Sequence, residues 1–397
     1  MSRLFMPVKV YEGEDVVINE ASTWTKLGRK ALIVTGKHSA KANGSLDDVI
    51  KALDLNEIPY IIFDKVEENP SVETIMDAVA FAKDEKVEFV VAIGGGSPLD
   101  ASKSIALMLK HLDWDASNLF VANEDDSHLP LCLIPTTCGT GSEVTGVSVL
   151  TRHDLRTKQS ISYKIFADIA LLDAKYLISL SPKNLKNTAM DAFCHLVESY
   201  INSGASVYSR NICMEGFNSF RQILAVLKDE RKADMKDYFT LLRTSTYAGM
   251  AIAQAGTTIP HGLSYAFTYR LGVEHGKACG YFLAGYLKMA CKKWTCNTPE
   301  ISNQIYDDFK ASDEFKTLGE YEVNRILNAA GIKDIPEFEE LFIKLCGDVN
   351  ESESLDTVLN DTVDAVFNNK AKLAMVPFEL TREDLVEIAY NMKIEGE

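Results

Sequence analysis

The sequence predicts an α/β domain built on a parallel sheet, followed by an all-α domain. Three observations support this fold class. Short apolar runs alternate with amphipathic stretches in residues 1–178, whereas residues 179–397 consist almost entirely of helical patterns. The length of 397 residues is also sufficient for two domains of ordinary size. A cleft between two such domains is the usual place for an active site.

The expected strands are continuous apolar runs, and they lie at residues 30–36, 60–63, 89–93, 131–135 and 169–173. A helical stretch at 71–86 follows the second strand, and another helix follows the glycines after the third. Continuous apolar strands that alternate with helices are typical of a parallel sheet covered on both faces. In the helical half, Ser181 is a suitable N-cap and Pro182 suits the first turn of a helix.

Composition and charge argue against several classes of protein. The formal net charge of −16 disfavours binding to nucleic acid or to anionic lipid, both of which attract basic surfaces. The sequence contains no apolar run of about 18 residues, as a membrane-spanning helix requires, and its start does not resemble a secretory signal. The eight cysteines are scattered without a CxxC pair, which favours free thiols in a reducing cytoplasm. We therefore expect a cytoplasmic protein.

Three glycines at 94–96 directly follow the third expected strand and precede a helix. We expect Ser97 at the N-cap, Pro98 at the first helical position and Asp100 three residues beyond the cap. Glycines allow close approach of a diphosphate, and a helix N-terminus supplies N–H donors and a positive dipole end. Because the spacing is not GxGxxG, the glycines alone also fit a tight turn without a ligand.

A second loop, PTTCGTGSE at 135–143, also follows an apolar strand. The hydroxyl groups of Thr136, Thr137 and Thr140 could contact a ribose phosphate, although a polar loop without a ligand has the same composition. Two such loops at the carboxyl ends of parallel strands favour a nucleotide site.

A candidate metal site lies in the helical half. Asp191 and His195 have i, i+4 spacing on one helix, and His261 and His275 are each followed by glycine. Three of the seven histidines therefore accompany a carboxylate in a set suited to a divalent transition metal. Each histidine taken singly also fits a helix cap or a packed core. Glu198 could orient a ligand or be an ordinary ion-paired glutamate.

A nucleotide site and a metal site together indicate metal-assisted hydride transfer between a nicotinamide and an alcohol. Two alternatives from other classes remain. A metal-dependent hydrolase would use the same ligands to activate water but has no need of the glycine loop. A non-catalytic nucleotide-binding protein would leave the four ligands unexplained.

These motifs together resemble the iron-containing (group III) alcohol dehydrogenases. The resemblance rests on GGGSPLD at 94–100, PTTCGTGSEVT at 135–145, MDAFCHLVESY at 190–200 and HG at 261 and 275. The 1,3-propanediol, butanol and 4-hydroxybutyrate dehydrogenase branches are the most similar. Glycerol-dehydrogenase-like and dehydroquinate-synthase-like enzymes of the same wider fold are a near alternative, but they usually lack PTTxGTGSE.

The resemblance implies a Rossmann-like N-terminal domain and an all-α C-terminal domain, the dehydroquinate synthase-like fold. It implies NADP or NAD as cofactor, Fe²⁺ or Zn²⁺ as metal, and a small alcohol, diol or aldehyde as substrate. Relatives are often homodimers. The implied metal ligands are Asp191, His195, His261 and His275. The implied cofactor contacts are Gly95, Gly96, Ser97 and nearby Asp100, then Thr136, Thr137 and Thr140, with Asn69 and Lys158 close by.

Two positions bear on specificity and catalysis. Gly36 stands where NAD-specific members have an aspartate, which leaves room for a 2′-phosphate that Lys37 and His38 could contact. We therefore predict a preference for NADP(H). Tyr265 stands where many members carry a second histidine thought to assist proton transfer. Its unperturbed pKa of about 10 makes it a poor base near neutrality, and a wall of the pocket is an equally suitable role.

Overall fold

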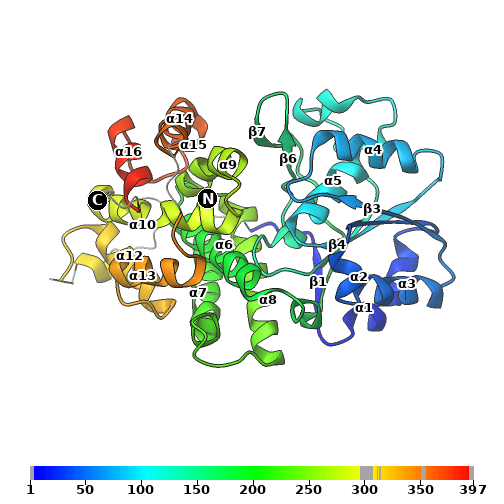
Figure 1. Cartoon of the computed structure of the whole chain (residues 1–397), viewed down its shortest axis with the longest axis horizontal. Coiled ribbons are helices and arrows are strands. Elements are labelled where there is room, and N and C mark those ends of the chain that lie inside the picture. The colour runs from blue at the N-terminus through cyan, green and yellow to red at the C-terminus, as the bar shows by residue number, and fades with distance from the viewer. Residues whose placement is uncertain (1–3, 296–306, 311, 313, 350–354, 393–397) are drawn as a thin grey trace. The chain divides into compact units, whose positions relative to one another are not determined.

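The computed structural model describes residues 4–295, 307–310, 312, 314–349 and 355–392. The chain forms two compact units (Figure 1), of which one is Met6–Ser181 and the other comprises the residues from Pro182 onward with those up to Phe5. The division therefore falls after Ser181, whereas the sequence placed it near residue 178. Phe5 joins the helical unit because its backbone N–H donates to Gln254 Oε1 (2.9 Å) and its carbonyl accepts from Gln254 Nε2 (2.8 Å).

A six-stranded sheet in the order β1-β8-β5-β4-β2-β3 forms the centre of the first unit. Every pair of neighbouring strands is parallel, which confirms the predicted fold class. The strands are β1 (Lys9–Glu12), β2 (Ala31–Gly36), β3 (Tyr60–Val66), β4 (Phe89–Gly94), β5 (Leu131–Pro135) and β8 (Ile169–Leu172). All five expected strands are present. The edge strand β1 was not predicted, because its sequence KVYE is largely exposed and has no apolar run.

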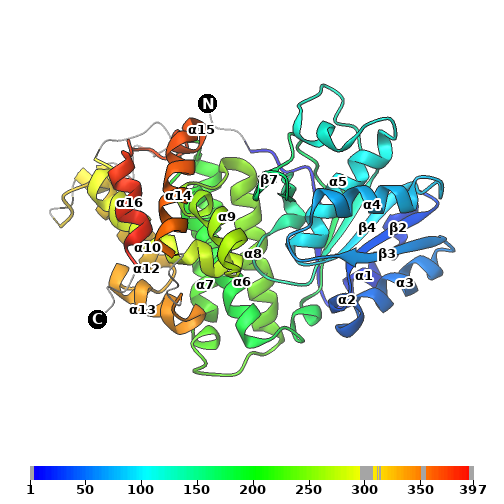
Figure 2. The same ribbon diagram turned by 45° about the horizontal axis from the view of Figure 1, so that its top comes forward.

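Side chains that alternate along each strand enter two separate cores, one on each face of the sheet. Leu32 and Val90 pack with residues of α4 and α5, whereas Ile33 and Val91 pack with residues of α3. Figure 2 shows α4 and α5 on one face and α1, α2 and α3 on the other. The helices of this unit are α1 (Val16–Asn19), η1 (Ala21–Lys26), α2 (Ser39–Ala42), α3 (Ser45–Leu55), α4 (Val72–Ala82), α5 (Gly96–Lys110), η2 (Ala116–Phe120), η3 (Ser142–Val144) and η4 (Ala174–Leu177).

An antiparallel hairpin of β6 (Val149–Arg152) and β7 (Thr157–Ser160) lies outside the main sheet. It was not predicted, because its two strands are short and β7 contains only the polar sequence TKQS. An isolated bridge between Ser71 and Thr151 joins the hairpin to the start of α4.

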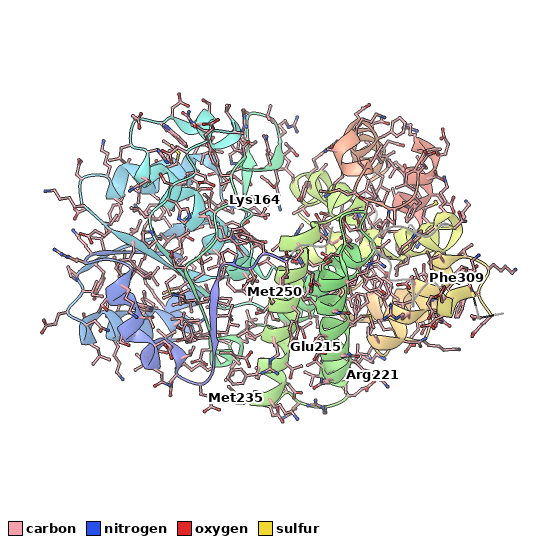
Figure 3. All side chains as sticks on the ribbon, turned by 180° about the vertical axis from the view of Figure 1, so that it is seen from behind. Lys164, Glu215, Arg221, Met235, Met250 and Phe309 are labelled. Carbon is pink, nitrogen blue, oxygen red and sulfur yellow. The ribbon has the colours of Figure 1, made fainter. Side chains whose placement is uncertain are left out.

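The second unit is helical throughout the part of the chain that the structure describes. Its first helix, α6, begins at Pro182 as predicted. Figure 3 labels Glu215 and Arg221 on α7 and Met235 and Met250 on the neighbouring α8. The helices are α6 (Pro182–Tyr200), α7 (Val207–Leu227), α8 (Met235–Ala255), α9 (Ile259–Leu271), α10 (His275–Lys293), α12 (Leu318–Ala329), α13 (Ile335–Cys346), α14 (Leu355–Asn368), α15 (Lys370–Leu373) and α16 (Arg382–Tyr390).

Two expectations about the whole chain can be compared with the described residues. None of their helices is long and apolar enough to cross a membrane. Seven of the cysteines carry free thiols, as expected, and Cys296 lies outside the described residues.

Candidate functional site

Three polar residues of α6 lie on one face of the helix and are buried in the helical unit. Asp191, His195 and Glu198 have exposed fractions of only 4%, 5% and 0%. Their spacing of four and three residues places them one above another along the helix. Burial of two carboxylates and an imidazole is costly unless charged or hydrogen-bonding partners face them.

The N-termini of α9 and α10 supply those partners. His261 lies in the first turn of α9, and His275 is the first residue of α10. The Oδ1 atom of Asp191 is 3.5 Å from His261 Nε2 and 3.9 Å from His275 Nε2. The structure therefore brings together residues that are 84 positions apart in the sequence.

Gly276 explains why one of the HG motifs requires glycine. A Cβ atom added there would lie 1.9 Å from the carbonyl oxygen of Asn187 and 3.0 Å from Asp191 Cβ. Only a residue without a side chain allows α10 to approach α6 closely enough to place His275 beside Asp191.

Glu198 fixes the orientation of the His261 ring. Its Oε1 atom accepts a hydrogen bond from His261 Nδ1, and its Oε2 atom accepts from the Thr258 backbone N–H at 2.7 Å and hydroxyl at 3.1 Å. Burial alone would raise the pKa of the Glu198 carboxyl, but His261, Lys372 and the Thr258 backbone N–H together lower it. With Nδ1 engaged by Glu198, the other ring nitrogen of His261, Nε2, faces Asp191. Glu198 is thus a buried orienting residue and not a solvated one.

The cluster has unsatisfied ligand atoms that fit a cation. Asp191 Oδ1 and His261 Nε2 are buried and have no hydrogen-bond partner. Burial would raise the pKa of the Asp191 carboxyl, but His195, His275 and His261 outweigh it and lower that pKa. A buried carboxylate and a buried imidazole nitrogen that face each other at 3.5 Å without a hydrogen bond are suitable ligands for a divalent metal.

The residues whose ligand atoms lie close together differ from the ligand set that the sequence predicted. Among the described residues, ligand atoms of Asp191, His261, His275 and Cys279 all lie within 4.8 Å of one another. His195 lies beside them, with its ring stacked on that of His261 at a centroid distance of 4.3 Å. Cys279 was missed, although its i, i+4 spacing from His275 in HGKAC was a usable signal.

The predicted phosphate loop lies between β4 and α5, but the expected cap was wrong. Gly95 is the N-cap and α5 begins at Gly96, so Ser97 lies inside the first turn. The helix begins earlier because Gly94 has a φ of 153°, which turns the chain immediately after the strand. Asp100 does not cap the helix, and its carboxylate instead accepts hydrogen bonds from Ser142 Oγ (2.5 Å) and the Val149 N–H (2.9 Å).

The second loop packs directly on these glycines. Thr136 donates its backbone N–H to the carbonyl of Gly94 at 2.9 Å, next to the pairing of Gly94 with Pro135. A Cβ atom added at Gly95 would lie 3.0 Å from Thr137 Cγ2, and one at Gly96 would lie 2.7 Å from Thr140 Cγ2. The two loops thus form one continuous surface at the carboxyl edge of the sheet, as their order in the sequence predicted.

Asn69 and Lys158 join the same surface. The Asn69 N–H donates to Ser97 Oγ at 3.0 Å, and Lys158 Nζ donates to Asn69 Oδ1 at 2.7 Å. Asn69 has a left-handed backbone with φ of 58°, a conformation that asparagine tolerates better than most residues.

Lys103 is a buried residue of this region that the sequence analysis missed. Its side chain has no solvent exposure, and Nζ donates to Ser142 Oγ (2.7 Å), Thr145 Oγ1 (3.2 Å) and the Val147 carbonyl (2.8 Å). Asp100 Oδ1 lies 3.6 Å away. The ammonium group therefore joins α5 to the segment that follows Thr140. The only signal in the sequence was the position of Lys103, a charged residue on an otherwise apolar face of α5.

The remaining predicted residues are placed as follows. Gly36 ends β2, which pairs directly with β4, and Lys37 and His38 are exposed just beyond it. Tyr265 lies one turn after His261 on α9, with its ring stacked near His275 at a centroid distance of 6.3 Å.

Comparison with known proteins places these sites in a family. The model of the iron-containing alcohol dehydrogenases matches residues 7–174, and the model of the C-terminal part of the Fe-containing alcohol dehydrogenase family matches residues 186–389. The chain belongs to the iron-containing alcohol dehydrogenase family. This family consists of oxidoreductases, so membership favours the redox hypothesis over the metal-dependent hydrolase and the non-catalytic nucleotide-binding protein.

Individual members of the iron-containing alcohol dehydrogenase family are similar over most of their length. The long-chain-alcohol dehydrogenase 1 of Geobacillus thermodenitrificans is 31% identical over 279 residues, which are 68% of this chain and 69% of that protein. The NADPH-dependent butanol dehydrogenase of Clostridium saccharobutylicum is 27% identical over 77% of this chain and 78% of its own. An iron-containing alcohol dehydrogenase from Thermotoga maritima superposes with a TM-score of 0.84, at 32% identity over 98% of this chain and 99% of its own.

Proposed function

We propose that this chain is an iron-dependent dehydrogenase that prefers NADP(H) and interconverts small primary alcohols or diols with their aldehydes. The observation that carries the proposal is the pair of buried ligand atoms Asp191 Oδ1 and His261 Nε2, which lie 3.5 Å apart and make no hydrogen bond. Such a pair is stable when a cation lies between the two atoms.

The proposed metal ligands are Asp191, His195, His261 and His275. A divalent metal held there would polarise the alcohol oxygen and lower the pKa of the hydroxyl group. The protein itself contributes the orientation of these ligands. Glu198 fixes the ring of His261, and Gly276 permits the approach of α10 that places His275. The His/Asp set also suits Zn²⁺, so the choice of iron rests on family membership.

The proposed cofactor site is the surface formed by the two loops of the α/β unit. Gly95, Gly96 and Ser97 would hold the diphosphate at the N-terminus of α5, because the first N–H groups of a helix have no acceptor within the helix. Thr136, Thr137 and Thr140 would contact the ribose and nicotinamide, and the bound nicotinamide would supply the hydride acceptor. Because the overall charge is −16, the net charge of the protein does not favour this binding, which relies mainly on glycines, hydroxyls and a helix end.

The preference for NADP(H) rests on the end of β2. Gly36 carries no carboxylate that would repel a 2′-phosphate, and Lys37 and His38 are exposed next to it. The NADPH-dependent relative from Clostridium saccharobutylicum is consistent with this preference. We expect kcat/KM to be higher with NADPH than with NADH. The ratio of these two values should fall in the Lys37→Ala variant and stay unchanged in the control variant Lys110→Ala. Equal or higher kcat/KM with NADH in the unmodified protein would contradict the preference.

Tyr265 is included among the proposed active-site residues as a hydrogen-bond donor near His275. Its hydroxyl is a poor base near neutral pH. A proton therefore has two alternative routes, one through the Tyr265 hydroxyl and one through water or the cofactor ribose. Replacement by phenylalanine tests this role, since an unchanged pH–rate profile of kcat would rule out a relay through the hydroxyl.

A panel of alcohols and aldehydes tests the function as a whole. The protein would be loaded anaerobically with Fe²⁺ or Zn²⁺, and nicotinamide absorbance would be followed with NADP(H) and NAD(H). We expect turnover of at least one small aldehyde, lost in Asp191→Ala and His261→Ala variants that keep the far-ultraviolet circular dichroism of the parent. Absorbance that does not change with any member of the panel, in protein shown to contain metal, would overturn the proposal.

A further inference from the structure

The sulfur atom of Cys279 is part of the cluster of ligand atoms in the helical unit. It lies 3.8 Å from His275 Nε2 and 3.9 Å from His275 Nδ1, and Cys279 has no solvent exposure. The i, i+4 spacing on α10 directs both side chains to the same side of the helix. Cys279 is therefore held beside a proposed metal ligand by the geometry of one helix.

The distances within the cluster are close to those between neighbouring ligand atoms of a metal site. Bonds of about 2.0–2.3 Å to nitrogen, oxygen and sulfur imply ligand atoms about 3.3–3.7 Å from one another. The separation of Asp191 Oδ1 and His261 Nε2 is 3.5 Å, and that of Asp191 Oδ1 and His275 Nε2 is 3.9 Å. The 3.8 Å separation of Cys279 Sγ and His275 Nε2 is, like the 3.9 Å one, slightly longer than this implied range. Small contractions of the longer separations would bring these groups around one ion, with the ring of His195 stacked beside them on that of His261.

A second observation distinguishes this cysteine from an ordinary buried thiol. Asp191 Oδ1 and His261 Nε2 are both buried without a hydrogen-bond partner, and a ligand atom of each of these two residues lies within 4.8 Å of Cys279 Sγ. Cys213 on α7 is equally buried but belongs to no such group among the described residues. The surroundings of Cys279, and not its burial alone, indicate a ligand.

We propose that Cys279 coordinates the divalent metal through its thiolate, alongside the carboxylate and imidazole ligands, and so raises the affinity of the site for Zn²⁺ relative to Fe²⁺. The thiol releases its proton to solvent as the sulfur–metal bond forms, and no electron transfer is involved. Thiolate is a soft ligand that favours Zn²⁺, whereas carboxylate and imidazole alone accept either ion. The inference rests on the metal dependence proposed above.

Cobalt substitution tests the proposal independently of activity. Co²⁺ bound through sulfur shows thiolate-to-metal charge-transfer absorption in the near ultraviolet, while its visible bands report binding through any ligands. We expect the wild-type protein and Cys213→Ser to show both absorptions, and Cys279→Ser and Cys279→Ala to show only the visible bands. Near-ultraviolet absorption that is absent in wild type, or that persists in both Cys279 variants, would overturn the proposal while leaving the metal site intact. Absence of all cobalt bands would overturn the proposed metal dependence as well.

X-ray absorption of the zinc-loaded wild-type protein provides a test that needs no variant to fold. We expect one sulfur neighbour at about 2.3 Å and nitrogen or oxygen neighbours at about 2.0–2.2 Å. Neighbours of nitrogen and oxygen only would overturn the assignment. In competition between Zn²⁺ and Fe²⁺ under anaerobic conditions, Cys279→Ser should shift the bound ratio toward iron by about tenfold or more, and an unchanged ratio would contradict the proposed selectivity.

Discussion

The Nδ1 atom of His261 is hydrogen-bonded to Oε1 of Glu198, a glutamate with no solvent exposure. The same carboxylate binds the Thr258 N–H at 2.7 Å, so it holds both the ring of His261 and the start of the helix that carries it. A ligand whose outer nitrogen is bound to a carboxylate is more basic and better oriented toward the metal. The relationship therefore connects the fold of the helical unit to metal affinity.

Glu198→Gln tests that connection. The amide keeps the size of the side chain but removes the negative charge, so we expect the Kd for metal to rise about 10- to 100-fold. Competition with a chromophoric chelator measures this change. Glu215→Gln, at an exposed position of α7 (Figure 3), is the matched control and should leave the Kd unchanged. A Kd for Glu198→Gln equal to that of the control would show that the hydrogen bond does not support the ligand.

Lys103→Met should disturb the proposed cofactor site without touching the metal cluster. Burial lowers the pKa of the Lys103 ammonium, and Asp100 and Glu143 oppose that effect. Removal of the ammonium leaves the buried oxygens of Ser142 and the Val147 carbonyl without their donor, at an expected loss of about 3 kcal/mol of stability. We also expect the Kd for NADPH to rise, because the segment after Thr140 loses its connection to α5.

Chemical denaturation and cofactor titration check these two effects. Lys110→Met, at the exposed end of the same helix, is the control for the loss of a lysine from α5. Metal affinity should be the same in both variants. A Lys103→Met protein with parental stability and NADPH affinity would show that the buried hydrogen bonds are not needed.

Gly96→Ala should displace the threonine loop. The added methyl group would lie 2.7 Å from Thr140 Cγ2, which is too close for either group to stay in place. Overpacking of this kind costs about 1–3 kcal/mol, and we expect weaker NADPH binding. The double variant Gly96→Ala/Thr140→Ser should recover much of the loss, because serine removes the methyl but keeps the hydroxyl that accepts from the Ser142 N–H. Additive losses in the double-mutant cycle would contradict this contact.

Much of the architecture and of the candidate sites could be predicted from local patterns. The buried strands were visible as apolar runs because both faces of the sheet are covered, whereas β1 and the β6–β7 hairpin were invisible because their residues are polar or exposed. Asp191, His195, His261 and His275 could be proposed as ligands because unusual residues recur in recognisable motifs. The structure brings Asp191, His261 and His275 together and stacks His195 on His261. Helix starts were less certain, and the cap at Gly95 depends on a backbone angle that the sequence does not display.

Long-range contacts account for what the sequence did not reveal. Lys103 bonds to residues about 40 positions away, so its spacing carries no signal. Gly276 could be noticed in HG, but its close approach to the Asn187 carbonyl depends on how α10 packs on α6. The buried state of Glu198 likewise follows from α9, which begins 61 residues later.

Metal removal should loosen the helical unit in a localised way. All the proposed ligands belong to α6, α9 and α10, so binding energy from the metal stabilises those helices against opening. At a free metal concentration of about 100 times the Kd, binding stabilises the folded state by about 2.7 kcal/mol. Amide exchange through openings that release the metal is then about 100-fold slower. We expect a chelator to accelerate hydrogen–deuterium exchange in peptides from α9 and α10 and to leave the amides of β2 and β4 unchanged. The Asp191→Ala variant should already exchange at the chelated rate. Equal acceleration in the sheet would show that the chelator destabilises the protein by a route other than this cluster.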